Sequence, residues 1–410
     1  MEPPEGTSSD YEFLSPMGYG NSSSCGYCGA RGATRSRRFS YYATAKSLSP
    51  QFYQTLLDRS WRRSGTLLQF KPSRDQRQAI NRFNRYVLGE SYIKEAARVY
   101  PRSRDETRKR DNEFKLTERV HEAEYANLKK PPEPAHKLAV TLEDDGFTEE
   151  KYEVYDNYQK VVHKEAPQDR TPRAFKRFLC NSPLRRQTMV APDGSRRRLG
   201  SYHQCYRIDG DLVAIGILDL LPDCVSSVYF LYHESIHKYA PGKLGALFEI
   251  ALATEGAYRW WYPGFYIHSC PKMRYKIDYS PQYILDPEAL SWDPLDKEIL
   301  GMLDRKPFVS LSLERQAAAK NRGNSLDDED GMDSDMPGIP SLAEMEEVDL
   351  DHIALKVFPR GPLFETSDLV GWDTKKITDW PSIKASVAEL VAALGPDVVG
   401  RICLDSSPRE

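Results

Sequence analysis

The sequence predicts an α+β protein with a mostly antiparallel sheet and one crossover helix. Two observations carry this prediction. Three β-forming runs follow one another through short turns between residues 200 and 232. A helical pattern at 242–260 comes next, and a further β-forming run at 261–270 follows it directly. A hairpin meander that feeds a crossover helix and returns as a strand is typical of layered α+β domains.

The meander has the strongest local signals in the chain. Residues 200–208 read as a strand, and the Asp-Gly pair at 209–210 favours a tight hairpin turn. Residues 212–221 are apolar except for Asp219, which predicts a buried central strand. After a turn at Pro222, residues 225–232 form the third run, rich in β-forming side chains.

The crossover helix is predicted from an apolar face. Between residues 242 and 260, apolar side chains recur at helical spacing: Leu244, Leu247, Phe248, Ala251 and Leu252. Further helices are predicted where a capping residue precedes such a pattern, at 49–59 after Ser49 and at 73–87 after Ser73. Weaker patterns predict a helical pair at 148–163 and 171–179, a strand at 355–364 and a helix at 383–394.

Changes in composition divide the chain into six segments. They are a disordered lead at 1–24, a small Cys-containing domain at 25–90, a charged linker or insertion at 91–134, the sheet domain at 135–305, an acidic low-complexity insert at 306–351, and a last strand and helix at 352–410.

Composition excludes several classes of protein. Of the 410 residues, 40% are hydrophobic, which is enough for a core and excludes a wholly disordered or collagen-like chain. No run of eighteen apolar residues occurs, so we expect no transmembrane helix. The N-terminus lacks the pattern of a secretory signal. We therefore expect a cytoplasmic or nuclear protein whose seven cysteines are thiols.

Charge is distributed unevenly. The net charge is -3, yet residues 31–110 contain 20 Lys and Arg against 6 Asp and Glu. Eleven acidic residues and no Lys or Arg lie between residues 327 and 351. The basic half favours contact with a polyanion such as RNA, although a solvated surface is the alternative interpretation.

Two motifs resemble parts of metal sites. Cys25 and Cys28 have the spacing that brings two thiolates to one Zn or Fe–S centre; a redox pair and a pair without a ligand are the alternatives. Residues 233–237 (HESIH) match the zinc-protease pattern with His233 and His237 as ligands. The motif directly follows a strand and is cut off by Pro241, which argues against a long helix that could hold both imidazoles.

Several polar side chains lie on strands predicted to be buried. Residues 201–206 (SYHQCY) flank the central strand, and Asp219 interrupts it. Buried polar groups cost free energy unless they are paired or face a cavity, so these positions are either a hydrogen-bonded network or part of a site. Residues 266–273 leave the last strand and enter a loop, where catalytic groups often lie.

Six motifs together carry a resemblance to the eukaryotic arginyl-tRNA–protein transferase family. They are CGYC (25–28), DRSWRRSG (58–65), QFKP (69–72), GSYHQ (200–204), LPDCVSSVY (221–229) and GFYIHSCPKM (264–273). The resemblance implies transfer of arginine from arginyl-tRNA to the amine of proteins with N-terminal Asp or Glu, which marks them for ubiquitin-dependent degradation by the N-end rule. It also implies a GNAT-like acyltransferase fold for residues 135–305.

The chain departs from the family in two respects. Phe248 stands where the helix motif of the family is expected to have a basic residue, and the second departure concerns the N-terminal cysteines. The N-terminal metal site of the family uses an adjacent Cys-Cys pair in addition to CxxC. Here only residues 66–68 separate two motifs that should flank this pair, and no Cys-Cys occurs in the chain. Cys25 and Cys28 therefore form at most half of a Zn or Fe–S site, and we expect no cofactor in catalysis.

An aminoacyl ester is already activated, so the predicted chemistry needs positioning and proton transfer without an enzyme nucleophile. The predicted catalytic residues are His203, Tyr206, Asp219, Tyr266 and His268. The predicted substrate-binding residues are Ser201, Gln204, Ser226, Ser227, Lys272 and Arg274. The predicted tRNA-binding residues are Arg59, Trp61, Arg62, Arg63, Lys71, Arg74 and Arg77. We expect a monomer; the alternatives are an inactive RNA-binding protein and a zinc protease.

Overall fold

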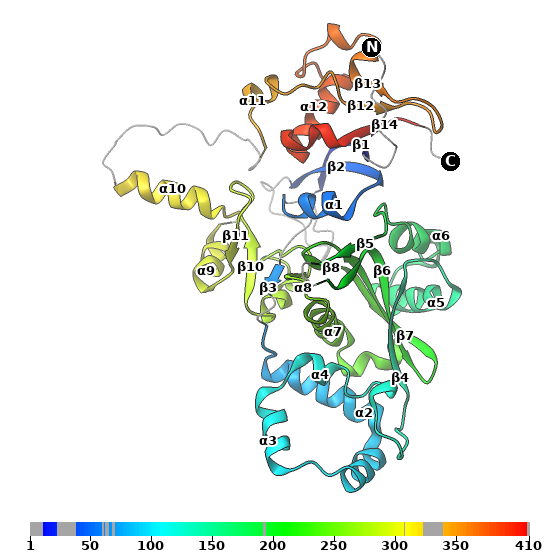
Figure 1. Ribbon diagram of the computed structural model, residues 1–410. Helices are drawn as coiled ribbons and strands as arrows, with labels where there is room; N and C mark the ends of the chain where they lie inside the picture. The colour runs from blue at the N-terminus through cyan, green and yellow to red at the C-terminus, as the bar shows by residue number, and fades with distance from the viewer. Residues whose placement is uncertain are drawn as a thin grey trace.

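Two β-sheets organise the chain in a computed structural model (Figure 1). A larger sheet and its helices lie beside a smaller sheet that the two ends of the chain build together. The structure describes residues 11–22, 38–59, 61, 65–67, 70–191, 194–306, 308–322 and 339–407.

The larger sheet has nine strands within the described residues, in the order β11-β10-β3-β9-β8-β7-β6-β4, and β5 pairs with β6. Its strands are β3 (Gly65–Leu67), β4 (Leu138–Asp144), β5 (Gln187–Val190), β6 (Arg196–Ile208), β7 (Asp211–Leu220), β8 (Cys224–Tyr232), β9 (Trp260–Tyr262), β10 (Gln282–Leu285) and β11 (Trp292–Pro294). All of these pairings are antiparallel except β8 with β9.

The smaller sheet has the order β13-β12-β14-β1-β2. Its strands are β1 (Glu12–Ser22), β2 (Arg38–Ser47), β12 (Ala354–Lys356), β13 (Phe364–Glu365) and β14 (Ile402–Asp405). The described α-helices are α1 (Pro50–Leu57), α2 (Arg74–Val99), α3 (Arg104–Glu113), α4 (Leu116–Val120), α5 (Glu149–Tyr158), α6 (Pro172–Phe175), α7 (Pro241–Glu255), α8 (Pro271–Arg274), α9 (Lys297–Arg305), α10 (Leu311–Arg322), α11 (Leu342–Glu346) and α12 (Ile383–Leu394).

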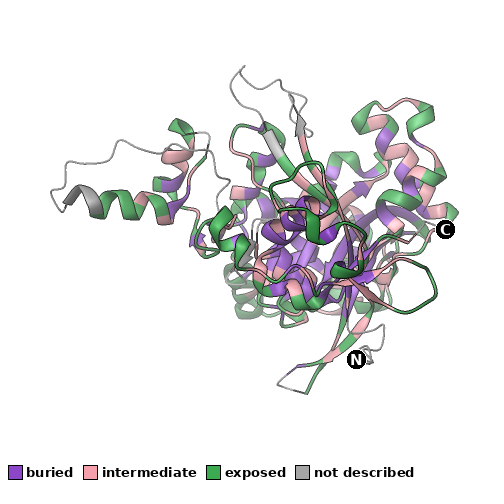
Figure 2. Cartoon of the chain, turned by 90° about the horizontal axis from the view of Figure 1, so that it is seen from above, coloured by how far each residue is buried: buried purple, intermediate pink, exposed green. Residues whose placement is uncertain are grey.

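The predicted meander and crossover helix are confirmed. Asp209 and Gly210 adopt φ of 56° and 100° between β6 and β7, a left-handed pair that suits a tight hairpin. β7 is buried from Leu212 to Leu220, as its apolar run predicts. α7 covers one face of the sheet and connects β8 to the parallel strand β9, while α5 covers the other face. Figure 2 shows buried residues concentrated in the middle of the molecule.

The last predicted strand is much shorter than expected. We predicted a strand over residues 261–270, but β9 ends at Tyr262. Pro263 has no backbone N–H for a ladder, and Gly264 turns the chain with φ of 81°. The rest of the segment is a loop that ends in the short helix α8.

The prediction of a disordered lead at 1–24 is wrong for the described residues 11–22. They form β1, which pairs with β2 and, in parallel, with β14 near the other end of the chain. Phe13 and Leu14 are buried there. Pro16 and the glycines of this segment hide the alternation of a strand, and its second partner is distant in sequence.

The segments 25–90 and 352–410 do not form separate units. β2 and α1 pack with β14 and α12 in one apolar core, whereas β3 joins the larger sheet and α2 packs on α7. Arg59 holds the two ends together: its guanidinium donates to both carboxylate oxygens of Asp397 and, at 2.9 Å, to the carbonyl of Leu394. The predicted strand at 355–364 is instead the hairpin β12–β13.

We expect Arg59→Ala to lower the free energy of unfolding by about 1–2 kcal/mol. The substitution removes a bidentate ion pair and a donor to the carboxyl end of α12. Urea unfolding measures the change. Asp397→Asn should cost less, because the bond to Leu394 remains; an equal cost for both substitutions would contradict a role for that bond.

The segment 91–134, predicted as a charged linker or insertion, is an ordered helical unit, which corresponds to the second alternative. α4 packs on α2 and on α7. Three apolar side chains of the segment, Phe114, Val120 and Ala123, are buried. The many charged residues form the outer surface, so the composition resembled that of a linker although the helices have a core.

The acidic segment 306–351 is described only outside 323–338. It begins with α10 and ends in α11, where Met345 and Leu350 join the core of the smaller sheet. None of the described helices combines the length and the apolar character that a membrane-spanning helix needs.

Candidate functional site

The larger sheet opens where β8 and β9 part. The two parallel strands pair only from Cys224 to Ser226, opposite Trp260 to Tyr262. β8 continues from Ser227 to Tyr232, but the chain leaves β9 at Pro263. Among the described residues, no strand pairs with β8 on this side beyond Ser226. A strand edge without a neighbouring strand can offer backbone donors and acceptors to a ligand.

A row of polar side chains crosses the sheet beside this opening. Ser201, Asp219, Ser226 and Tyr262 are register partners on four consecutive strands, β6 to β9, and all four are buried. Partners directly opposite one another share a face of the sheet. The tyrosine hydroxyl donates to Asp58 Oδ1 of α1 at 2.8 Å. The structure thus brings together three predicted site residues and adds Tyr262 and Asp58.

The row leads to a cavity of about 460 Å³ between α1 and β9–β11. Four of its lining residues are aromatic: Trp260, Tyr262, Tyr283 and Trp292. Two carboxylates, Asp58 and Asp223, complete the wall together with Gln54 and Arg259.

The cavity has the chemistry of a cation site. Burial raises the pKa of Asp58, and the nearby Asp223 raises it further. No ion pair of either carboxylate is found within the described residues. Arg259 already stacks on Trp260, 5.7 Å from the ring centroid. Carboxylates next to aromatic faces bind guanidinium and ammonium groups, so the cavity fits a cationic side chain.

Glu249 is the main group that sequence reasoning missed. It lies on α7 facing the sheet, is only 1% exposed, and accepts a hydrogen bond from Trp261 Nε1 at 2.9 Å. Burial raises its pKa to about 7, although hydrogen bonds from Trp261 and Ser227 favour the charged form. Gly216 makes room for it, since a Cβ there would lie 3.3 Å from Glu249 Oε1.

Glu249 connects to the opening through Ser227, the first residue of β8 beyond the paired part. A carboxyl group with a pKa near 7 can gain or lose a proton at neutral pH. A signal for it exists in the sequence: Glu249 is the only charged side chain between Leu244 and Leu252 of an otherwise apolar helix.

Tyr266 and His268 form a hydrogen-bonded chain with a third residue. The Tyr266 hydroxyl lies 2.8 Å from His268 Nδ1, and His268 Nε2 lies 2.7 Å from Asp304 Oδ1. Asp304 comes from α9, and the hydrogen bond to His268 lowers its pKa. A carboxylate that orients an imidazole toward a hydroxyl is an arrangement suited to proton transfer. No local signal in the sequence identifies Asp304.

Lys272 and Arg274 are exposed on α8, which follows Tyr266 and His268 in the sequence. Arg274 hydrogen-bonds to Tyr266. Burial lowers the pKa of His163, and the charge of Lys272 lowers it further. His163 Nε2 lies 3.1 Å from the hydroxyl of Tyr229 on β8. The loop after β9 therefore runs beside the part of β8 that β9 leaves.

The predicted residues of β6 do not share one cavity. Tyr206 donates to Gln204 Oε1 at 2.7 Å on the α7 face. His203 points to the opposite face, is fully buried, and has Nε2 3.0 Å from the carbonyl of Leu179. Burial lowers the pKa of His203 to about 4. Because side chains alternate along a strand, His203 and Tyr206 cannot face one substrate together, and a catalytic role for either stays a prediction.

Segments 201–206 and 266–272 line neither the cavity beside Asp58 nor the two larger cavities found within the described residues. Ser226, Ser227 and Glu249 lie at the opening, and the loop after β9 passes it at Gly264, where a Cβ would lie 3.9 Å from the carbonyl oxygen of Ser227.

The predicted tRNA-binding residues have different surroundings. Arg59 and Trp61 bind the C-terminal part of the chain, the indole through Nε1 to the carbonyl of Ala393 at 3.1 Å. Arg77 donates to the carbonyl of Pro72 and lies over Phe114. Lys71 and Arg74 are exposed at the start of α2. Arg62 and Arg63 lie outside the described residues.

The zinc-protease alternative is not favoured. His233 Nδ1 bonds to Ser235, and His237 Nδ1 lies 3.1 Å from the hydroxyl of Tyr232. The described residues contain no group of three or more metal-ligating side chains. Cys25 and Cys28 lie outside them.

We expect His237→Ala to leave any activity of the protein within about twofold of the wild-type rate. Its exposed imidazole contacts the hydroxyl and the ring of Tyr232 on the surface, and removing an exposed contact of this kind has little effect. Rates of the wild-type and variant proteins, each with and without added Zn²⁺, test this. This expectation would be contradicted if the variant lost activity and added Zn²⁺ raised the rate of the wild type but not that of the variant.

Comparison with known proteins identifies the domain that holds the opening. Residues 150–286 match the family model described as "Arginine-tRNA-protein transferase, C terminus". The chain is 40% identical over 185 residues to arginyl-tRNA–protein transferase 1 of Arabidopsis thaliana, which covers 43% of this chain and 29% of the relative. It is 39% identical over 197 residues to that of Drosophila melanogaster, covering 45% and 40%.

More distant similarity extends to bacteria. An aspartate/glutamate leucyltransferase of Helicobacter hepaticus is 24% identical over 159 residues, which covers 39% of this chain and 61% of the relative. The chain thus spans less than half the length of the two eukaryotic relatives named above. The predicted resemblance is confirmed for the domain at 150–286.

Proposed function

We propose that this chain, whose residues 150–286 carry the C-terminal domain of the arginine-tRNA–protein transferases, transfers arginine from arginyl-tRNA to the N-terminal amine of acceptor proteins. The opening between β8 and β9 carries this proposal, because groups suited to proton transfer belong to β8 and to the loop that leaves β9. Glu249 bonds to Ser227 of β8, and Tyr266 and His268 follow the end of β9 in sequence and bond to each other and to Asp304.

The chemistry needs two proton transfers and no covalent enzyme intermediate. The acceptor amine attacks the ester carbonyl, a C–N bond forms, and the ester C–O bond to the tRNA breaks. The amine loses a proton, and the departing ribose oxygen gains one. Glu249, as a carboxylate, accepts the first proton through the hydroxyl of Ser227. Tyr266, hydrogen-bonded to His268, supplies the second.

The cavity beside Asp58 supplies selectivity for arginine. A guanidinium in this cavity would lie between Asp58 and Asp223 and against Trp260 or Trp292. Tyr262 and its register partner Ser226 lie on the face of the sheet that bears the cavity, whereas Ser227 and Glu249 lie on the α7 face. The donor would therefore pass through the opening, where β8 has no neighbouring strand, with its charged side chain on one face and its ester on the other.

Selectivity for acidic acceptors is the finer part of the proposal. Bacterial relatives are named aspartate/glutamate leucyltransferases, which favours an acidic N-terminal residue in the acceptor. Lys272 and Arg274 are exposed cations beside the opening and can pair with such a side chain. Products of this reaction would enter ubiquitin-dependent degradation.

Transfer of labelled arginine tests the proposal directly. We expect incorporation into a peptide with a free N-terminal Asp or Glu, little into the same peptide with N-terminal Gly, and none into its N-acetylated form. The fly relative is the positive control for the charged tRNA. A folded protein that binds tRNA but transfers no arginine would support the alternative, an RNA-binding protein without activity.

The proposed transfer requires no cofactor, because the ester is already activated. Half a Zn or Fe–S site at Cys25 and Cys28 stays a separate proposal. Zinc and iron contents of the wild-type protein and the Cys25→Ser/Cys28→Ser variant test it: metal bound to the wild type alone supports the site, and equal contents contradict it.

A further inference from the structure

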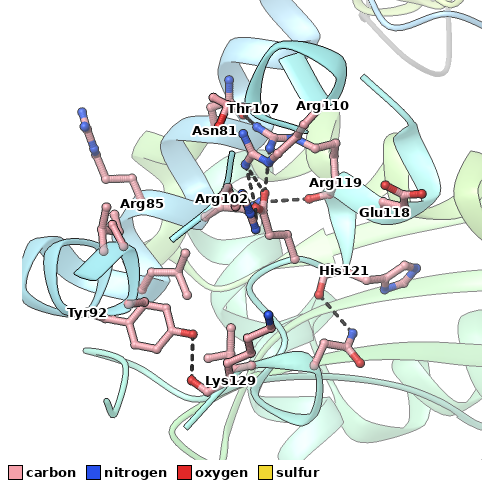
Figure 3. A pocket seen from close by; sticks show the side chains of 18 of the residues that line it. Asn81, Arg85, Tyr92, Arg102, Thr107, Arg110, Glu118, Arg119, His121 and Lys129 are labelled. Carbon is pink, nitrogen blue, oxygen red and sulfur yellow. Dashed lines mark hydrogen bonds and ion pairs between the residues drawn. The ribbon is translucent and has the colours of Figure 1, made fainter. Parts of the chain in front are cut away.

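The largest of the three cavities lies away from the proposed transfer site. It is a hollow of about 1220 Å³ enclosed by α2, α3, α4 and the segment that follows α4 (Figure 3). Ligand sites for small molecules commonly have about 300–1,000 Å³, so this hollow can take part of a polymer. We call it the α2–α4 hollow.

Three guanidinium groups meet at one carboxylate in its wall (Figure 3). Glu122 Oε1 lies 2.6 Å from Arg110 Nη2 and 3.5 Å from Arg102 Nη2, and Glu122 Oε2 lies 2.9 Å from Arg119 Nη1. Asp111 pairs with Arg110 as well, at 2.9 Å between Oδ1 and Nη1. Two negative charges thus face three positive charges, which leaves one positive charge at this point of the wall.

Arg119 also has unused hydrogen-bonding capacity. Its side chain is 6% exposed, stacks on Phe114 and donates from Nη2 to Asn81. Its Nε has no hydrogen-bond partner within the described residues, and Nη1 lacks hydrogen-bond geometry to Glu122 despite their proximity. A buried donor without an acceptor costs free energy, which an anionic ligand in the hollow would recover.

The other residues that line the hollow are also more often basic than acidic. Arg82, Arg85 and Lys129 add positive charge, whereas Asp111 and Glu118 are the acidic residues besides Glu122. Arg82 is exposed, and Arg85 pairs with Glu90 outside the hollow. Guanidinium groups bind phosphate oxygens in pairs.

We propose that the α2–α4 hollow binds phosphate groups of an RNA backbone. The size of the hollow favours a polymer, and the excess of guanidinium groups favours phosphate. RNA is preferred to an acidic protein because the proposed transfer reaction already requires a tRNA as donor. The proposal rests on the proposed function in one respect: the RNA is the tRNA of the donor.

Binding of uncharged tRNA tests the hollow without the transfer reaction. We expect Arg102→Ala/Arg110→Ala to weaken binding at least tenfold and to reduce the slope of log affinity against log salt by about 2. Arg108→Ala is the matched control, because Arg108 is exposed on α3 and does not line the hollow; it should weaken binding less than twofold. Thermal unfolding verifies that each variant is folded.

Glu122→Gln makes the test independent of lost stability. Neutralising this carboxylate removes the ion-pair partner of Arg102 and Arg119 and one of the two partners of Arg110, so tRNA should bind several-fold more tightly. Unchanged or weaker binding by this variant would overturn the proposal, as would equal effects of the double variant and Arg108→Ala. Competition distinguishes RNA from other anions. If inorganic phosphate or polyglutamate displaced the bound tRNA as effectively as RNA does, the proposal would also be overturned.

Failure of this proposal is distinguishable from failure of the proposed function. If the wild type transfers arginine but the double variant still binds tRNA normally, the proposal for the hollow fails and the proposed function stands. A protein whose hollow binds tRNA as expected but transfers no arginine would exclude only the transferase activity.

Discussion

Glu249→Gln is expected to lower the rate of arginine transfer about 100-fold and to remove its dependence on a group with a pKa near 7. In the wild type the active form is the carboxylate, so the rate should rise through pH 7 as Glu249 loses its proton. The acceptor amine adds a second rise near pH 8, about its own pKa. The variant should keep that second rise and lose the first, which a pH profile of kcat measures.

The same substitution should stabilise the fold at alkaline pH. Burial raises the pKa of Glu249 from 4.5 to about 7, so the folded state holds a proton that the unfolded state has released. Stability of the wild type therefore falls as pH rises from about 4.5 through 7, by about 3 kcal/mol in total. Glutamine has no proton to lose. Urea unfolding at pH 5 and pH 8 should show a smaller decline for Glu249→Gln.

Two further variants keep this prediction specific. Glu153→Gln is the matched control, because Glu153 is exposed on α5; its pH profile should equal that of the wild type. Trp261→Phe removes a hydrogen bond that favours the carboxylate, so the lower limb of the profile should move to higher pH. A profile of Glu249→Gln that matches the wild type would contradict a role of this residue in proton transfer.

The sequence predicts those parts of the fold whose signals are local. The hairpin at Asp209 and Gly210, the buried run of β7 and the capped helix after Ser49 each depend on residues that adjoin one another. β1 could not be predicted in this way. Its strand partner β14 lies at the other end of the chain, and no periodicity marks its own residues as a strand.

The helical unit at 91–134 shows a second limit. α3 has no buried residue, and its sequence is almost entirely charged. A composition of this kind is typical of a linker, yet Phe114 and Val120 are enough to anchor the neighbouring turns. Charge density reports how polar a surface is, but it does not tell whether a few apolar side chains find a core.

The site follows the same division. Tyr266 and His268 were predicted because their motif ends a strand, and the structure joins them by a hydrogen bond. Their partner Asp304 and the carboxylate Asp58 come from elements far away in sequence. Only the folded sheet shows that Ser201, Asp219 and Ser226 form one row, because that requires the register of three strands.

Asp58→Asn and Asp223→Asn are expected to lower kcat/KM for arginyl-tRNA by about 10- to 100-fold each. A hydrogen bond to a charged group contributes about 1.5–3 kcal/mol, and either substitution removes one negative charge from the guanidinium cavity. At position 58 asparagine can still accept from Tyr262 through Oδ1, and a flip of the Gln54 amide lets that side chain accept from Nδ2, so the local fold should persist. Burial raises the pKa of Asp58, hence its replacement should not lower stability above about pH 4.

The preference of the protein for one aminoacyl-tRNA over another distinguishes loss of the cation site from a general loss of activity. Citrulline has the shape of arginine without its charge, so the wild type should strongly prefer tRNA carrying arginine over tRNA carrying citrulline. In Asp58→Asn/Asp223→Asn this preference should nearly vanish, because arginyl transfer falls while citrullyl transfer does not. Asp211→Asn, exposed at the opposite end of β7, is the matched control and should keep the preference. If the double variant discriminated as well as the wild type, the guanidinium would have to lie elsewhere, and the aromatic cavity would have no part in choosing the amino acid.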